Sequence, residues 1–246
     1  APAGPGKTTD RLVSFVDYAP TVLSLLDLPV PETMQGEAFL GANTQNGPEY
    51  LYGFRDRVDE AYDLSRSVRS RDYLYIRNYL PYYSWMQPSV YSDLGEIQEA
   101  IRSYAEKNAD TLTPPQRAYA GETRPTEEFY AVEADPQNLV NLLDGELSTE
   151  QIKALEAHRA AYLAKRREIL DLGFIPESIL YDFINEENLT MREIALGESN
   201  HRPDLDAIWA AADLVGKGTR DEFLDLVHSG DDSIRFWGVI GLRQGF

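Results

Sequence analysis

The sequence predicts a chain of two unlike parts: a mixed α/β part up to about residue 145, and a helical part after it. The first part contains short segments whose apolar residues alternate with a period of two, most clearly over 73–79, as in half-buried strands. Beyond Pro176 the apolar residues recur only with helical spacing. With 246 residues, of which 43% are hydrophobic, the chain is long enough to bury a core.

The first predicted elements are a strand and a helix. Residues 12–16 form a short apolar run, which we expect to be a strand. Asp17 can cap a helix from about Tyr18, with Pro20 in its first turn and Pro29 at its end. The expected buried face of this helix consists of Val22, Leu23, Leu25, Leu26 and Leu28.

An antiparallel sheet is predicted next, with a hairpin at its centre that turns at Arg71 and Asp72. The predicted strands are 49–54, 65–70, 73–79 and 128–132. Ser92 can cap a helix that runs to about Lys107. Its apolar stripe consists of Leu94, Ile97, Ile101 and Tyr104. Residues 111–125 are expected to form a loop.

The helical part opens with a capping box, in which Ser148 and Gln151 satisfy the first amide groups of a long helix. Gly173 is the expected stop of this helix. Its expected buried residues are Ile152, Leu155, Tyr162 and Ile169. Three shorter helices are predicted over 204–215, 219–228 and 231–242.

Composition excludes several classes of function. The chain has no cysteine, so it contains no disulfide, thiolate zinc site, cysteine nucleophile or iron–sulfur cluster. The net charge of -18 argues against nucleic acid and anionic membranes as partners, because both require a basic face. No segment approaches the roughly 20 apolar residues of a membrane span. The loop-like start at residues 1–6 leads us to expect a piece of a longer protein.

Two local motifs are similar to functional loops but lack their context. Residues 1–8 match a relaxed phosphate-loop pattern, yet Pro2 and Pro5 remove amide donors and a strand-like run follows where a helix is needed. Nucleotide binding through Lys7 is therefore a disfavoured alternative. Residues 197–201 lack the last glycine of a nucleophile elbow.

The histidines are expected to be solvated, and the paired acids to be either solvated or placed at helix starts, where the helix dipole favours them. His158, His201 and His228 form no metal-binding pair, and His158 lies on the charged side of its helix. The acidic pairs lack the spacing of a calcium loop: Glu127-Glu128, Glu186-Glu187 and Asp231-Asp232. We therefore predict no metal ligand and no catalytic residue in this chain.

Basic residues cluster in 55–77, where six arginines stand against five acidic residues in an otherwise acidic chain. The arginines are Arg55, Arg57, Arg66, Arg69, Arg71 and Arg77. Their planar guanidinium groups suit sulfate, phosphate or carboxylate. The alternative is a set of surface pairs between arginines and acids, each contributing little stability, and spacing alone favours that alternative.

Taken in order, the segments resemble the C-terminal part of the sulfatase family. Residues 13–23 are similar to a V-S-x-x-D-x-x-P-T-x-L helix start, and 36–40 to the Gly-x-x-Leu turn after it. Residues 66–69 and 75–79 look like the family's R-x-V-R and K-Y-I-x-N hairpin. Residues 129–142 resemble its E-L-Y-D-L-x-x-D-P segment. Within the family, bacterial proteins related to heparan N-sulfatase are the most similar.

This resemblance implies the C-terminal portion of an alkaline-phosphatase-like α/β fold with a small antiparallel-sheet subdomain. Residues 1–60 would end the catalytic domain, 61–176 would form the subdomain, and 177–246 would form an all-α HEAT-like extension. The implied partner is a sulfated carbohydrate, and the implied location is periplasmic or secreted.

The resemblance carries over substrate contact but no catalysis. The family's formylglycine motif and calcium ligands lie upstream of this sequence, so both groups are implied for the intact parent only. The chain alone is expected to be inactive. Arg55, Asp56 and Arg57 lie where the family's loop approaches the sugar, and they are the predicted substrate-binding residues. A non-catalytic module built on the helical repeat remains the alternative.

Overall fold

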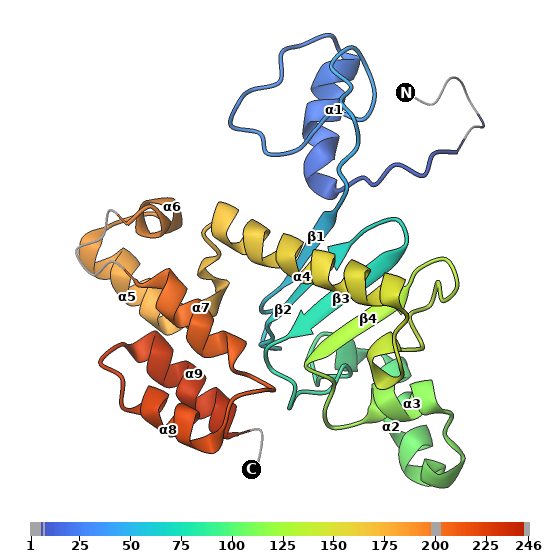
Figure 1. Ribbon diagram of the computed structural model, residues 1–246, viewed down its shortest axis with the longest axis vertical. Coiled ribbons are helices and arrows are strands. Elements are labelled where there is room, and N and C mark those ends of the chain that lie inside the picture. Colours follow the sequence, from blue (N-terminus) through green and yellow to red (C-terminus); the bar gives the residue numbers. More distant parts are fainter. Residues whose placement is uncertain (1–5, 7, 198–202, 244–246) are drawn as a thin grey trace.

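The computed structural model describes residues 6, 8–197 and 203–243. Its centre is a four-stranded antiparallel sheet in the order β1-β2-β3-β4, with the long helix α4 across one face (Figure 1). The strands are β1 (Leu51–Arg55), β2 (Ser65–Arg69), β3 (Tyr73–Asn78) and β4 (Glu127–Ala131). The predicted hairpin and its antiparallel neighbours are therefore confirmed.

Helices flank the sheet, and loops and short turns connect them. The helices are α1 (Tyr18–Leu25), α2 (Glu96–Lys107), α3 (Pro114–Ala120), α4 (Thr149–Glu168), α5 (Glu177–Glu187), α6 (Met191–Ala195), α7 (Leu205–Asp213), α8 (Arg220–Val227) and α9 (Asp232–Leu242). Short 3-10 turns are η1 (Phe15–Asp17), η2 (Ser92–Leu94), η3 (Ala109–Thr111), η4 (Leu142–Asp144) and η5 (Leu172–Phe174). None of the described helices is both long and apolar enough to span a membrane.

The hairpin owes its register to a tight turn and a buried cross-strand pair. Ser70 donates its amide to the carbonyl of Tyr73 over 2.9 Å, and its hydroxyl accepts the Tyr73 amide over 3.0 Å. Val68 then lies opposite Tyr75, and both side chains are buried. Because the side chains of a strand alternate between faces, this pairing fixes which residues face α4.

One hydrophobic core joins the sheet to the helical tail. It includes Val68 and Phe129 from the sheet, and Trp237 from α9. Two tryptophans secure the contact: Trp209 Nε1 donates to the carbonyl of Asp171 over 3.0 Å, and Trp237 Nε1 donates to that of Phe174 over 2.9 Å. The tail helices therefore pack against the sheet part across residue 176, where the sequence predicted a domain boundary.

The predicted strand at 12–16 is wrong. Its last residues form the 3-10 turn η1, because the Asp17 carboxylate accepts hydrogen bonds from the amides of Ser14 and Glu37. These bonds curl the chain, and no described strand lies beside it for pairing.

Helix α1 starts where predicted but buries the opposite side. Its polar side faces the returning loop, where Thr21 Oγ1 accepts the Phe39 amide and Ser24 Oγ accepts the Asn43 amide. The expected core residues Val22, Leu25, Leu26 and Leu28 are exposed instead, up to 64% for Leu26. In Figure 1 the helix stands apart from the sheet, which explains why its apolar side meets solvent.

Helix α4 keeps its predicted start and ends early. Ser148 caps it with the predicted capping box, but the helix ends at Glu168, and Leu170 adopts a left-handed φ of 53°. Gly173 is not the helix stop; it lies where a Cβ atom would collide with the guanidinium of Arg66. Of the four expected buried residues, Leu155 and Tyr162 are buried, whereas Ile152 and Ile169 are exposed.

The other predicted helices differ less from expectation. Helices α7, α8 and α9 follow the predicted ranges, with Asp204, Thr219 and Asp231 as their capping residues. The predicted loop at 111–125 contains α3, which begins with a capping box at Thr113 and proline in its first turn. Three members of the apolar stripe predicted for the helix from Ser92 are exposed: Leu94, Ile97 and Tyr104.

Candidate functional site

The candidate site is the loop that follows β1. Arg55 is the last residue of β1, and Asp56 and Arg57 follow it directly. An isolated antiparallel β-bridge between Val58 and Ala61 draws the two sides of the loop together. The Asp63 amide donates a hydrogen bond to the carbonyl of Asp56 over 3.1 Å. The sheet edge and these backbone bonds hold the loop in one conformation.

Below the loop, Arg66 forms a buried ion-pair network. It is 2% exposed, and its guanidinium donates to both oxygens of Asp171 over 2.7 and 3.0 Å. It also donates to Asp56 Oδ1 over 2.9 Å. Burial by itself would lower the pKa of Arg66, but the hydrogen bonds and the charge of Asp171 raise it above its ordinary value. Arg66 therefore stays charged and ties the loop to η5.

A second network surrounds Asp63, which is fully buried. Arg124 donates to both of its oxygens, over 2.9 Å to Oδ2, and Arg55 Nε lies 3.1 Å from Oδ2. Because an isolated buried carboxylate is costly, these two cations compensate the burial of Asp63 at this position.

The three predicted substrate-binding residues are all held in ion pairs. Arg55 pairs with Asp63, Asp56 with Arg66, and Arg57 Nη2 lies 2.8 Å from Glu177 of α5. Their side chains are nevertheless 41%, 48% and 46% exposed. The structure thus places them at the protein surface with one side anchored, and their contact with substrate stays a prediction.

The pairing of arginines with acids was the alternative that spacing favoured, and it is confirmed for most of the cluster. Arg71 pairs with Asp10 over 2.8 Å, in addition to the pairs of Arg55, Arg57 and Arg66. These pairs are not all at the surface, because Arg66 is buried by residues distant in sequence.

The expectation that His158 is solvated is wrong. It is 3% exposed, and its ring lies 5.1 Å from that of Tyr50 and 5.7 Å from that of Phe129. Its Nδ1 lies 2.7 Å from the carbonyl oxygen of Ala154. His158 shares a helix face with Leu155 at i−3 and Tyr162 at i+4, and this spacing was the signal that could have identified it as buried.

The acidic pair at 127–128 is not solvated either. Glu128 is buried and accepts hydrogen bonds from Asn78 and from the hydroxyl of Tyr130. Glu127 accepts two from Arg159, over 3.0 and 2.6 Å. Burial alone would raise the pKa of Glu127, but the bonds from Arg159 and Tyr75 lower it below its ordinary value.

The remaining candidate ligands and motifs are scattered or lie outside the described residues. Within residues 8–197 and 203–243, no group of three or more histidine, aspartate or glutamate side chains is placed to hold a metal ion. His228 is at the surface, as expected. Lys7 and His201 lie outside the described residues, so the structure says nothing of their motifs.

Two curated proteins from Formosa agariphila, each described as an ulvan-active sulfatase, are similar to part of the chain. One is 37% identical over 138 residues, which is 55% of this chain and 23% of the relative. The other is 26% identical over 144 residues, which is 56% of this chain and 26% of the relative. The chain thus spans about a quarter of the length of the curated relatives it matches. No protein-family model matches.

Solved structures give weaker likenesses. A 2-O GAG sulfatase is 19% identical with a TM-score of 0.38, over 78% of this chain and 30% of that one. A protein solved with its substrate D-glucosamine-2-N,6-O-disulfate is 14% identical with a TM-score of 0.36, over 61% of this chain and 23% of that one. TM-scores this low do not establish a shared fold. The curated relatives of this chain are sulfatases.

Proposed function

We propose that this chain is the carboxyl-terminal part of a carbohydrate sulfatase, and that the complete protein hydrolyses sulfate groups on an acidic polysaccharide. The observation that carries the proposal is the 37% identity with an ulvan-active sulfatase over 138 residues. The family-like motifs between residues 13 and 142 occur in the same order and support the same assignment. Ulvan is the first substrate to test, and heparan-type N-sulfates are the second.

In this proposal the chain contributes to substrate binding, and the catalytic groups come from elsewhere in the complete protein. Formylglycine needs a cysteine or serine precursor in its own motif, and the sequence contains no such motif. The described residues also offer no group of ligands for calcium. We therefore assign no step of hydrolysis to residues of this chain.

The proposed substrate contacts are Arg55, Asp56 and Arg57. A guanidinium group presents several N–H donors in one plane, so an arginine that already binds one carboxylate can still donate from its solvent side to a sulfate oxygen. Arg57 fits this role, because its side chain is 46% exposed and only one bond to Glu177 anchors it.

The test compares sulfate release by the complete protein and by the Arg57→Ala variant, with ulvan and heparin oligosaccharides as substrates. We expect KM to rise about tenfold, equivalent to about 1.4 kcal/mol, with kcat within about twofold. Arg71→Ala is the matched control, because Arg71 is also a surface arginine paired with one acid. An unchanged KM for Arg57→Ala would refute the binding role, and no release from either polysaccharide would refute the function.

Two further parts of the proposal concern the complete protein. The coding sequence upstream of Ala1 should contain a C-x-P-S-R or S-x-P-S-R motif, and the protein should be periplasmic or secreted. The isolated 246-residue chain should release no sulfate with or without calcium. Heat-sensitive turnover by the isolated chain would contradict this assignment of roles.

A further inference from the structure

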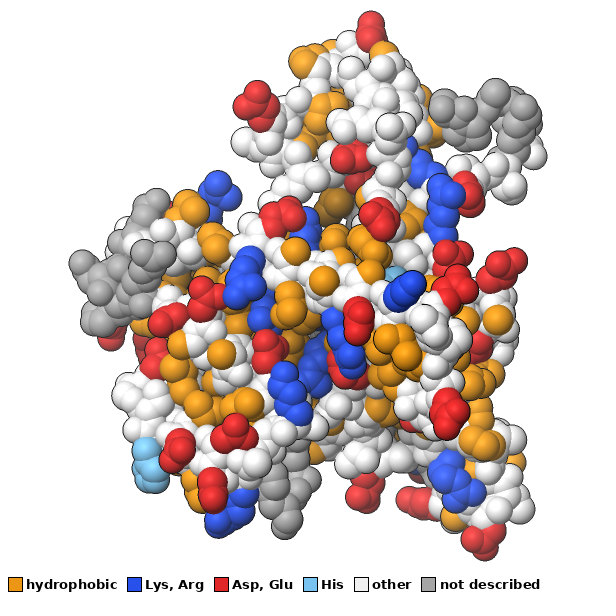
Figure 2. Space-filling view, viewed as in Figure 1, with side chains coloured by type: hydrophobic (Ala, Val, Ile, Leu, Met, Phe, Trp, Pro, Cys, Tyr) orange, Lys and Arg blue, Asp and Glu red, His pale blue; other side chains and the backbone are white. Residues whose placement is uncertain are grey.

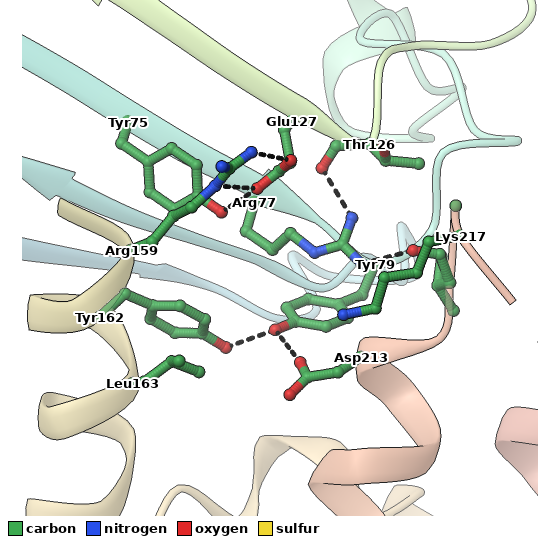
Figure 3. Close-up of a pocket in the computed structure, with 12 residues that line it drawn as sticks. Tyr75, Arg77, Tyr79, Thr126, Glu127, Arg159, Tyr162, Leu163, Asp213 and Lys217 are labelled. Atoms are coloured by element: carbon green, nitrogen blue, oxygen red, sulfur yellow. Dashed lines mark hydrogen bonds and ion pairs between the residues drawn. The ribbon is translucent and has the colours of Figure 1, made fainter. Parts of the chain in front are cut away.

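A cavity of about 400 Å³ lies where the sheet, α4 and the turn between α7 and α8 meet (Figure 3). Three tyrosines line it: Tyr75 and Tyr79 from the β3 segment and Tyr162 from α4. Its volume falls in the range typical of small-molecule sites. Figure 2 shows lysine and arginine side chains gathered near the middle of this face, which is unusual in a chain of net charge -18.

The two carboxylates that line the cavity, Glu127 and Asp213, each form an ion pair with an arginine. Glu127 Oε1 accepts from Arg159 and from the hydroxyl of Tyr75, and Oε2 accepts from Arg159 again. Asp213 accepts from Arg166 through both oxygens, over 2.9 Å each. Each acid is therefore neutralised by one cation.

Two further cations line the cavity and form no ion pair with a described carboxylate. Arg77 is 7% exposed, and its guanidinium donates to the carbonyl of Thr126 over 3.0 Å and to that of Val215. Carbonyl groups satisfy its N–H donors, and its charge helps to lower the pKa of its cross-strand neighbour Glu127, which Arg159 already neutralises. Lys217 is exposed and forms no ion pair with a described residue. The cavity thus carries an excess of positive charge.

The backbone fixes these two cations beside each other. Gly216 has a left-handed φ of 85°, and a Cβ atom there would lie 2.5 Å from Thr126 Cγ2. Only glycine allows the turn to approach β4 this closely. The bond from Arg77 to the Val215 carbonyl holds the same turn. Figure 3 shows the Lys217 side chain extending from this turn into the cavity.

We propose that this cavity binds a small organic anion, whose sulfate or carboxylate group is held by Arg77 and Lys217. The three tyrosines are at most 5% exposed, and their hydroxyl groups are hydrogen-bonded to Glu127, to Asp213 or to one another, so they form the wall behind the bound anion. That this body is a sugar rests on the proposed function, whereas the preference for an anion rests on the charges alone. The site is separate from the loop at 55–57, because it is built from β3, β4, α4 and the α7–α8 turn.

The test is a titration of the 246-residue chain by calorimetry, and by NMR with the Gly216 amide as reporter. Glucose 6-sulfate, glucuronate, inorganic sulfate and glucose are the probes. We expect saturable binding of the two anionic sugars and none of glucose. Lys217→Glu should weaken binding about tenfold or more. Lys153→Glu is the matched control, because it makes the same charge change at an exposed position near the start of α4 and should change Kd less than twofold.

Several outcomes would overturn the proposal. If glucose binds with the same Kd as glucose 6-sulfate, the charge of the ligand does not contribute to binding. If inorganic sulfate binds with the same Kd as glucose 6-sulfate, the sugar part of the ligand does not contribute to binding. Equal weakening by the two lysine variants would show a bulk charge effect. The titration measures binding and needs no turnover. A negative titration would therefore refute the anion site but not the proposed sulfatase activity. If the complete protein releases no sulfate, the titration still decides whether the cavity binds anions.

Discussion

The buried Arg66 network makes a quantitative prediction for stability. Replacing Arg66 by methionine keeps much of its volume but removes five hydrogen bonds: two to Asp171, one to Asp56 and two to backbone carbonyls. Asp171 is 7% exposed, so it becomes a buried carboxylate that has lost its cation. Removing one partner of a buried ion pair costs about 3–5 kcal/mol.

This loss is large against the total stability of a domain, which is about 5–15 kcal/mol. For a protein of this size it corresponds to a fall of about 10 °C in Tm. Urea unfolding followed by tryptophan fluorescence measures it directly, because Trp209 donates to the carbonyl of Asp171 itself. Arg71→Met serves as the control, since the Arg71–Asp10 pair is exposed and should contribute less than about 1 kcal/mol.

A loss below about 1 kcal/mol for Arg66→Met would refute this reasoning. It would mean that water or a shift of η5 solvates Asp171 when the guanidinium is absent. The double variant Arg66→Met/Asp171→Asn separates the possibilities. If the two residues act as a pair, its cost should fall below the sum of the two single costs by about 0.5–3 kcal/mol.

Three other predictions concern local features. Gly173→Ala should cost about 1–3 kcal/mol in urea unfolding because its Cβ collides with the Arg66 network. Gly145→Ala should cost almost nothing, because a Cβ there meets the Leu142 carbonyl oxygen at an ordinary contact distance of 4.0 Å. The folded state lowers the pKa of Glu127, so its stabilisation is present above the carboxyl's ordinary pKa of 4.5 and is lost as pH falls through the folded value. The stability difference between wild type and Glu127→Gln should therefore shrink from pH 6 to pH 3, and a constant difference would contradict it. In hydrogen exchange, the backbone amides of α1 should exchange faster than those of α4, because the apolar face of α1 has no partner among the described residues. Equal protection of the two helices would contradict this prediction.

Local signals in the sequence predicted the elements that local interactions determine. The hairpin at 65–79 and the capping box at Ser148 need only neighbours within a few residues, and both are as predicted. Helix α3 was missed because the prolines that begin it are equally common in loops. The true end of α4 was missed because Leu170, a residue that rarely adopts a left-handed φ, takes the place expected of glycine.

The candidate site depended on contacts that no local pattern contains. Asp171, the partner of Arg66, is 105 residues away in sequence, so spacing within 55–77 could not distinguish a buried arginine from a surface one. The burial of Arg77 could not be predicted for the same reason, because its acceptor, the Val215 carbonyl, is 138 residues away. Arg57, by contrast, was expected in a loop and lies there, whereas Arg55, expected in the same loop, is the last residue of β1.

The buried arginines explain how so acidic a chain can still offer defined places to an anion. Arg66, Arg77, Arg124 and Arg166 are each less than 10% exposed, and each joins segments far apart in sequence. Arg66, Arg124 and Arg166 form ion pairs with buried or half-buried carboxylates. Their charges therefore do not offset the acids at the surface. In the cavity, positive charge in excess of the carboxylates comes from Arg77 and its neighbour Lys217, and partly exposed guanidinium groups lie in the loop after β1. Because acids elsewhere repel an anion over roughly a Debye length of 8–10 Å, such a ligand should favour these two places over the acidic parts of the surface.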